Sequence, residues 1–285
     1  MEFRVAPERV FALTPSLTWD AAKEKAWGQK ASVFGTLSSL VFRPAGDDVQ
    51  ITKSELRYEP FWHIDCRSEL EYEVRETLSF TVKNPTAKYV TLEVTGDQHF
   101  DVVNGAVQLA GVTRCRDSHH REAVVDGMTG TPRPDLAPNL KRPMTEVREL
   151  DTFAPPDAVV WAPEFRSSFL VRQELAQLMT AIQADTIITD TVEVSSIALF
   201  FRPVYAFEYL WRSKSKTQSL EIDGVTGESK TTSTTVGSRV SRRLSKELLF
   251  DIGADAVDLL VPGGGIAMKV GRAVIRRQES KPPHA

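Results

Sequence analysis

Residues Leu56–Arg67 read LRYEPFWHIDCR, and residues Leu199–Leu210 read LFFRPVYAFEYL. When the two stretches are aligned on Pro60 and Pro203 without gaps, apolar and aromatic residues fall at the same alternating positions. This alternation is the spacing of a β-strand with one well-buried face. Because proline lacks the amide that a sheet ladder needs, we expect each proline at a sheet edge, a bulge or a strand break.

Two further marks recur in the same order in both halves of the chain. Val124–Gly130 reads VVDGMTG and Glu221–Gly227 reads EIDGVTG, which is typical of a strand that leaves into a glycine turn. A helical pattern precedes each strand region, at Thr18–Gln29 with Thr18 as the N-cap, and at about residues 163–184. These repeated marks predict that one helix-plus-strands unit occurs twice.

The predicted fold class is therefore α+β, with tandem duplicated helix-plus-antiparallel-sheet units and a C-terminal helical hairpin. The first copy is longer, and the surplus reads as an inserted hairpin or meander with a two-residue turn at Asn104-Gly105. The predicted divisions are a first unit over 1–130, a Pro-rich linker over 131–156, a second unit over 157–230, and a polar linker with the helical hairpin over 231–285.

The order of helix, antiparallel strands and a strand ending in Asp-x-x-Thr-Gly resembles PepSY-like modules. The matching residues are Asp126, Thr129 and Gly130 in the first copy, and Asp223, Thr226 and Gly227 in the second. The resemblance covers about 60 residues per copy. It implies helices packed on curled antiparallel sheets, and a binding or inhibitory module in place of an enzyme.

Composition restricts the possible partners and the compartment. The 285-residue chain has a net charge of −3 and a pI near 6.0, so it lacks the basic surplus of a nucleic-acid-binding protein. The N-terminus shows no signal peptide, and no uncharged apolar run is long enough to span a bilayer. With two cysteines only, these features predict a cytoplasmic protein without a structural disulfide.

The aromatic strand pair is the candidate binding surface, with the alternative that these side chains are simply core. Its residues are Tyr58, Phe61, Trp62, Phe201, Tyr205 and Trp211. Duplication can build such an extended surface, and no catalytic motif is present. The leading prediction is therefore a non-enzymatic binding or assembly module that acts through protein–protein contacts, with no catalytic residues and no cofactor.

Both cysteines and three of the five histidines lie in two short stretches, HIDC and CRDSHH. Two Cys and two His suit tetrahedral zinc, so one alternative is a zinc site of His63, Cys66, Cys115 and His119. A zinc-dependent or thiol enzyme centred on Cys115, His119 and His120 is the matching alternative function. Against the zinc site, His63 and Cys66 are three apart in an expected strand and should point to opposite faces. The simpler interpretation is a buried free Cys66 and a polar loop at residues 115–120.

The C-terminal region is expected to form two helices, at about residues 239–260 and 266–277, around a Pro-Gly-Gly-Gly turn. In one antiparallel register, each acid of the first helix faces a base of the second. These predicted pairs are Asp258 with Lys269, Asp255 with Arg272, and Asp251 with Arg276. The other faces are apolar, so residues 239–277 should dock on the protein's own domain, on a protein partner or second copy, or on a membrane surface as a peripheral adaptor.

Overall fold

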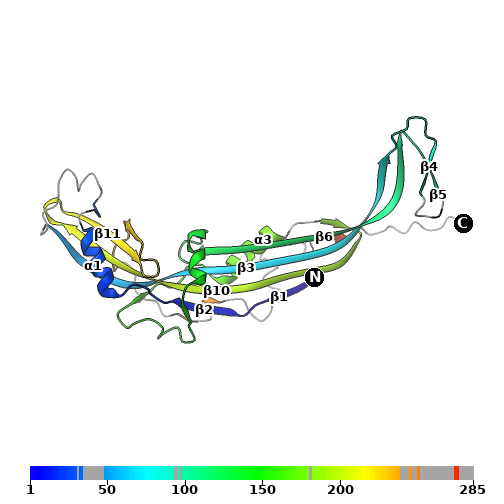
Figure 1. Cartoon of the computed structure of the whole chain (residues 1–285). Coiled ribbons are helices and arrows are strands. Elements are labelled where there is room, and N and C mark those ends of the chain that lie inside the picture. The colour runs from blue at the N-terminus through cyan, green and yellow to red at the C-terminus, as the bar shows by residue number, and fades with distance from the viewer. Residues whose placement is uncertain are drawn as a thin grey trace, which may run out of the picture.

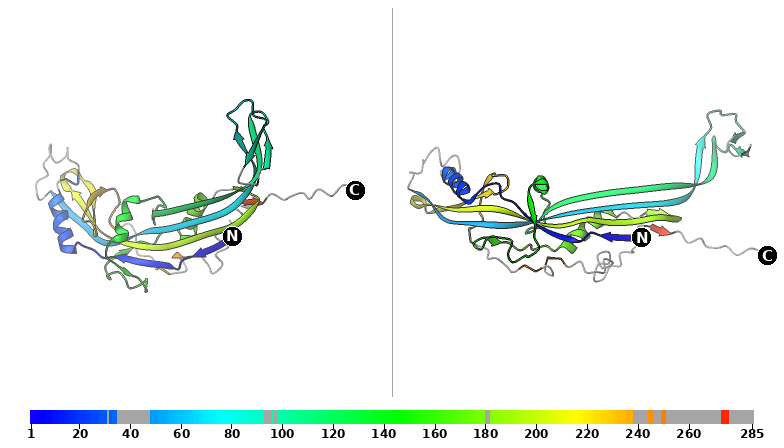
Figure 2. Two further views of the ribbon diagram at one scale, coloured as in Figure 1. Left: turned by 45° about the vertical axis from the view of Figure 1, so that its right-hand side comes forward. Right: turned by 60° about the horizontal axis from the view of Figure 1, so that its bottom comes forward.

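The computed structural model describes residues 1–30, 32–34, 48–92, 96, 98–179, 182–237, 244–245 and 249–250, and the backbone of 273–275 (Figure 1). Its body consists of long, gently curved strands that run side by side for most of the length of the molecule (Figures 1 and 2). The two ends differ, because helix α1 lies at one end and a two-stranded ribbon bends away at the other.

Three strands dominate the sheet: β3 (Val49–Thr81), β6 (Ala106–Asp126) and β10 (Thr186–Trp211). β3 is central, and it pairs antiparallel with β10 on one side and with β6 on the other. At about 3.3 Å per residue, β3 alone extends over roughly 100 Å. The polar segment at residues 115–120, predicted as a loop, is part of β6, and its ladder to β3 shows no register shift.

Some of the shorter strands extend this sheet, and others form two small separate sheets. β1 (Glu2–Val5) and β2 (Glu8–Leu13) pair in parallel with β10, so the sheet is mixed. The remaining strands are β7 (Met144–Glu146), β8 (Val159–Val160), β11 (Lys216–Asp223) and β12 (Ser229–Thr232) in the same sheet, and the separate pairs β4 (Tyr89–Leu92) with β5 (Gln98–Asp101) and β9 (Ile182–Ala184) with β13 (Ala273–Ile275).

The predicted α+β fold of tandem helix-plus-antiparallel-sheet units is wrong. Most of the described strands belong to one large mixed sheet, in which strands from both halves of the chain are neighbours over most of their length. The physical reason is the long β3–β10 ladder, which joins the two predicted units along their strands.

The helices are α1 (Trp19–Gln29) and α3 (Ser167–Leu178), with the 3₁₀ segments η2 (Pro134–Lys141) and η3 (Arg212–Lys214). Thr18 caps α1 as predicted, since its hydroxyl accepts a hydrogen bond from the amide of Ala21 at 3.3 Å. The second predicted helix is too long, because α3 ends at Leu178 and Ile182–Ala184 forms β9.

β10 is buried on both faces along residues 197–209, and so it reads as a near-continuous apolar run. α3 and the segment before it cover one face around Trp62, Ile64 and Leu199. Towards the other end, α1 covers Tyr205, Phe207 and Tyr209. Two core clusters therefore lie beneath α1 and α3, and a third lies around Phe61 and Phe200 against Leu136 of η2. The far end of the β3–β6 ladder is less covered.

The two prolines occupy equivalent places in the sheet. Pro60 of β3 pairs with Phe201, and Pro203 of β10 pairs with Tyr58, so a local two-fold relation exchanges the two strands. The carbonyl of Pro60 accepts the Gly127 amide at 2.9 Å, and that of Pro203 accepts the Gly224 amide at 2.8 Å. In each case the missing proline amide faces the point where the neighbouring strand leaves the sheet, so no ladder bond is lost.

The two Asp-x-x-Thr-Gly turns have the same hydrogen bonds. An oxygen of Asp126 accepts the amides of Met128 and Thr129 at 2.9 and 3.0 Å. An oxygen of Asp223 accepts the amides two and three residues after it, at 2.7 and 2.9 Å. Gly130 and Gly227 both have positive φ, at 68° and 75°. The repeated sequence marks therefore form repeated local structures within the single sheet.

Each helix docks on the turn of the other half. The amide of Ser16, just before α1, donates to the carbonyl of Gly224 at 2.8 Å. The amide of Glu164, just before α3, donates to the carbonyl of Gly127 at 2.8 Å. This exchange is the second reason that the halves do not form tandem units, since each strand pair is covered by the helix of the other half.

Candidate functional site: the outer strand β6 and its projecting end

The six aromatic side chains predicted as a binding surface are all buried. Their exposed fractions lie between 0% for Trp62 and 6% for Tyr58, and the other four are Phe61, Phe201, Tyr205 and Trp211. The ring nitrogen of Trp62 donates to the carbonyl of Phe165 at 3.0 Å, so this side chain joins the segment just before α3 to the sheet. In this structure the aromatic strand pair is core and offers no surface to a partner.

The structure does not bring the predicted zinc ligands together. Cys66 on β3 pairs with Arg121, whereas Cys115 on β6 pairs with Tyr72, six positions farther along β3. His63 points to the opposite face from Cys66 and bridges Ser196 and Glu122, at 3.0 Å from each. Among the described residues, no group of three or more His, Cys, Asp or Glu side chains could hold a metal ion.

The residues of the alternative site around Cys115 are also far from one another. Cys115 and His119 are four residues apart on one strand, which separates them by about 13 Å. His120 lies on the other face, where its Nε2 is 2.9 Å from Asp65. Cys66, the other thiol, is buried, and burial raises its pKa to about 12, so it stays protonated at neutral pH.

The predicted salt bridges of the C-terminal hairpin lie outside the described residues, since Asp251, Asp255, Asp258, Lys269, Arg272 and Arg276 belong to 251–272 and 276–285. Within the predicted second helix, Ala273–Ile275 instead form β13, which pairs in parallel with β9.

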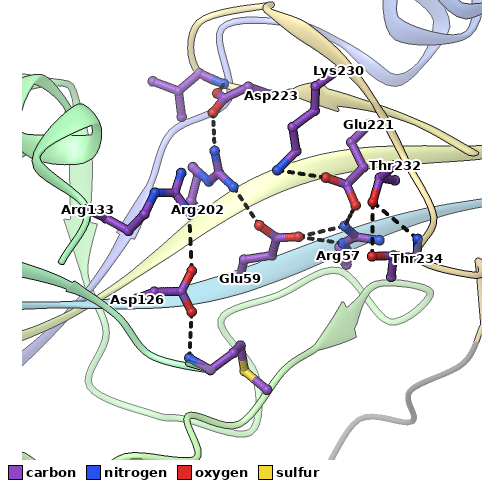
Figure 3. Close-up of polar contacts among 12 residues, drawn as sticks. Arg57, Glu59, Asp126, Arg133, Arg202, Glu221, Asp223, Lys230, Thr232 and Thr234 are labelled. Atoms are coloured by element: carbon purple, nitrogen blue, oxygen red, sulfur yellow. Dashed lines mark hydrogen bonds and ion pairs between the residues drawn. The ribbon is translucent and has the colours of Figure 1, made fainter. Parts of the chain in front are cut away.

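A buried cluster of charged side chains lies where the local two-fold exchanges β3 and β10, around the paired residues Glu59 and Arg202 (Figure 3). Glu59 lies between Arg57 and Arg202, at 2.7 Å from Arg57 Nε and 2.5 Å from Arg202 Nη2. Arg57 also contacts Glu221, and Arg202 Nη1 is 2.7 Å from Asp223. The cluster therefore links β3, β10 and β11 through alternating positive and negative charges.

Burial and pairing act in opposite directions on these groups. Burial opposes ionisation of Glu59, but Arg202 and Arg57 together hold the pKa of its carboxyl below its ordinary value. Burial also opposes the charge on Arg57 and Arg202, yet Glu59 raises the pKa of both guanidinium groups. All three side chains are therefore ionised, and their charges compensate one another.

A cavity of about 220 Å³ borders this cluster, with Asp126, Arg133, Trp161 and Lys230 along its walls. Lys230 Nζ is 3.0 Å from Glu221, Arg133 Nη1 is 3.2 Å from Asp126, and the Arg57 guanidinium lies 4.3 Å from the Trp161 ring centroid. Four basic side chains and three acidic ones line the cavity, and they are paired with one another: Arg57, Arg133, Arg202 and Lys230 with Glu59, Asp126 and Glu221. We assign the cluster to holding the two halves together.

The far end of the β3–β6 ladder projects from the sheet. β10 pairs with β3 only as far as Glu73, whereas β6 continues along β3 to Thr81 (Figures 1 and 2). We call residues 74–113 the arm; it comprises this two-stranded ribbon and the β4–β5 hairpin at its tip. An isolated two-stranded ribbon is marginally stable in water, and the arm lacks the third strand that β10 adds to the body.

The arm exposes large apolar side chains on both of its faces. Phe80 is 53% exposed and Val112 is 56% exposed, and they stand on opposite faces of the ribbon. Tyr89 and Val103 near the tip are 60% and 61% exposed. Half of the eight most exposed large apolar residues described thus belong to this one segment.

β6 is also an open edge beside the body. Over Ala106–Glu122 it pairs with β3 on one side, and no other described strand pairs with its outer side. An unpaired edge of this length is a template for another strand, and proteins usually protect such edges. Here the edge carries a charged row on its open face, with Arg114 at 2.8 Å from Glu71, and Arg116 in contact with Glu69.

Comparison with known proteins adds no family, because no family model, curated protein or solved structure matches this chain. Among the described residues, no helix combines the length and the apolar character that crossing a bilayer needs.

Sequence reasoning missed β6 as the candidate surface because residues 114–122, RCRDSHHRE, are polar on both faces of the strand. One signal was available. No proline or glycine interrupts the chain between Gly111 and Gly127, so nothing in that stretch ends the strand that the Asn104-Gly105 turn begins.

Proposed function

We propose that this protein is a non-enzymatic binding or assembly module that acts through protein–protein contacts. The observation that carries the proposal is the arm, where β3 and β6 continue past Glu73 as a ribbon with apolar side chains in solvent. Phe80 and Val112 stand on opposite faces and form no single patch, so the support comes from the number of exposed apolar side chains that this one projecting segment carries. The open outer edge of β6 supports the same conclusion, because it offers unpaired backbone groups next to the arm.

The distance between the candidate catalytic residues also supports a function without catalysis. Cys115 and His119 are too far apart along β6 for a nucleophile–base hydrogen bond, and the buried Cys66 thiol is protonated at neutral pH. We include a cytoplasmic location in the proposal, because Cys66 and Cys115 are both free thiols. Binding through residues 239–277 remains a separate prediction.

Photocrosslinking of the full chain tests this function. A photoreactive amino acid at Phe80, introduced in the cells that express the protein, should give discrete adducts with one or a few proteins. The same group at Trp27, which is 52% exposed on α1, is the matched control and should not give those adducts. Serine at both Phe80 and Val112 should reduce capture of the same proteins and change the unfolding free energy by only about 0.5 kcal/mol or less.

Two results would refute the arm as the binding element. One is an identical set of adducts from positions 80 and 27. The other is unchanged capture by the variant with serine at both Phe80 and Val112.

A further inference from the structure

We propose that an extended peptide strand of a partner protein adds to the outer edge of β6 between Arg114 and Glu122. This inference rests on the proposed function and specifies one partner and one site for it. The partner strand carries acidic side chains where it passes Arg114 and Arg116.

The hydrogen bonds at the end of β6 show which backbone groups face outward. The amide of Asp126 donates to Thr131, and the carbonyl of Val124 accepts from Arg133, so both residues face away from β3. The β3–β6 ladder has no register shift, so every even-numbered residue back to Ala106 faces the same way. The outward N–H and C=O groups of Arg114, Arg116, Ser118, His120 and Glu122 therefore form one line, and no backbone group of the described residues bonds to them.

This line of groups is bounded at both ends. At one end Thr131–Arg133 already occupies the edge beside Val124 and Asp126. At the other end the arm turns towards the β6 side of the sheet, as both views show (Figures 1 and 2). The open segment between these limits holds about nine residues of a strand, or roughly 30 Å.

The projecting arm beside this edge leaves room for a single peptide strand but not for a second copy of this chain. The arm bends towards the β6 side of the sheet (Figures 1 and 2), so in a two-fold antiparallel pairing of two β6 edges each arm would bend towards the sheet of the other copy. A peptide strand has no such arm, and it can use all five outward residues. With both backbone groups of each residue paired, it would form about ten hydrogen bonds, as many as an ordinary protein interface has.

The side chains on the open face set the charge of that strand. The Arg114 and Arg116 side chains are 59% and 68% exposed, and they stand beside the position of the added strand. Like charges directly opposite one another on a sheet are unfavourable, whereas opposite charges are favourable. A strand with lysine or arginine at these two positions is therefore disfavoured, and one with Asp or Glu is preferred. The Glu122 side chain is 53% exposed, and it favours a basic residue at the other end of the added strand.

Selection from a displayed library of random linear twelve-residue peptides on the full-length protein tests the inference. We expect enriched peptides that alternate in β-branched residues and carry acids at one end. Proline at Ser118 removes an outward amide without breaking the ladder to β3, and it should weaken these peptides about tenfold or more. Alanine at Ser118 is the matched control and should leave their affinity unchanged.

A second variant carries Glu at both Arg114 and Arg116, and it should enrich peptides with basic residues at the same positions. The inference is overturned if no peptide is enriched, or if the Ser118→Pro variant binds the enriched peptides as well as the Ser118→Ala variant does. It is also overturned if light scattering shows a dimer that Ser118→Pro dissociates, because the occupant is then a second copy. In each of these cases, adducts at Phe80 would still support the proposed function.

Discussion

Alanine in place of Glu59 is expected to lower the free energy of unfolding by about 3–5 kcal/mol. Glu59 lies between two buried guanidinium groups, with Arg57 1% and Arg202 9% exposed at the side chain. Without Glu59, Arg202 keeps only Asp223, and Arg57 keeps Glu221 and the more distant Glu55, so part of the buried positive charge loses its compensation. Chemical denaturation of the two proteins at neutral pH measures the difference.

The control is the exposed pair of Arg4 and Glu2, whose side chains are 62% and 58% exposed. Alanine at Glu2 should change the free energy of unfolding by less than about 1 kcal/mol. Equal effects of the Glu59 and Glu2 substitutions would show that the cluster does not hold the sheet together.

The contribution of Glu59 should also depend on pH in one direction. The pKa of Glu59 in the folded protein lies below its ordinary value of 4.5. A depressed carboxyl pKa stabilises the folded state at pH values above the unfolded pKa, and this contribution is lost as the pH falls through the folded pKa. The difference between the wild type and the Glu59→Ala variant should therefore be constant near neutrality and shrink below about pH 4.5.

Alanine at Gly127 or at Gly224 is expected to destabilise the protein by about 1–3 kcal/mol at each position. A Cβ at Gly127 would lie 2.9 Å from the carbonyl oxygen and 2.9 Å from the Cβ of Pro60. A Cβ at Gly224 would lie 2.9 Å from the carbonyl oxygen of Pro203. The two positions are equivalent under the local two-fold relation, so the two losses should be similar.

Gly28 in α1 provides the control, because a Cβ there meets nothing within 4 Å. Alanine at Gly28 should stabilise the protein by about 0.5–1 kcal/mol, since alanine favours a helix. A large loss at Gly127 with none at Gly224 would contradict the equivalence of the two turns.

The sequence was informative where structure depends on near neighbours. The Thr18 cap, the Asn104-Gly105 turn and the two Asp-x-x-Thr-Gly turns need only residues a few positions apart. The two residues at Asn104-Gly105 both have positive φ, as a two-residue hairpin turn requires. Short motifs of this kind carry their own geometry.

The arrangement of these parts could not be predicted in the same way. The pairing of β3 with β10 joins residues more than a hundred positions apart, and each helix covers the strands of the other half. Periodicity shows that a face is buried but does not show which element covers it. For that reason the sequence pattern predicts tandem units, although the long strands of both halves belong to one sheet.

The candidate surface was misplaced for a related reason. Alternating aromatics such as Trp62 and Tyr205 indicate a well-packed face, and in this chain that face is the core. An open edge leaves no comparable pattern, because it is defined by the absence of a neighbouring strand. Only the register of β6 on β3 shows that Ser118 and the residues around it have a free side.

Residue-resolved amide hydrogen exchange over Arg114–Glu122 in the free protein tests the open edge most directly. The amides of Arg116, Ser118 and His120 face away from β3 and should exchange quickly, whereas those of Asp117 and His119 bond to β3 and should exchange at least about tenfold more slowly. Slow exchange at every one of these amides would mean that β6 already has a partner on its outer side. Fast exchange at all of them would mean that the ladder to β3 does not form.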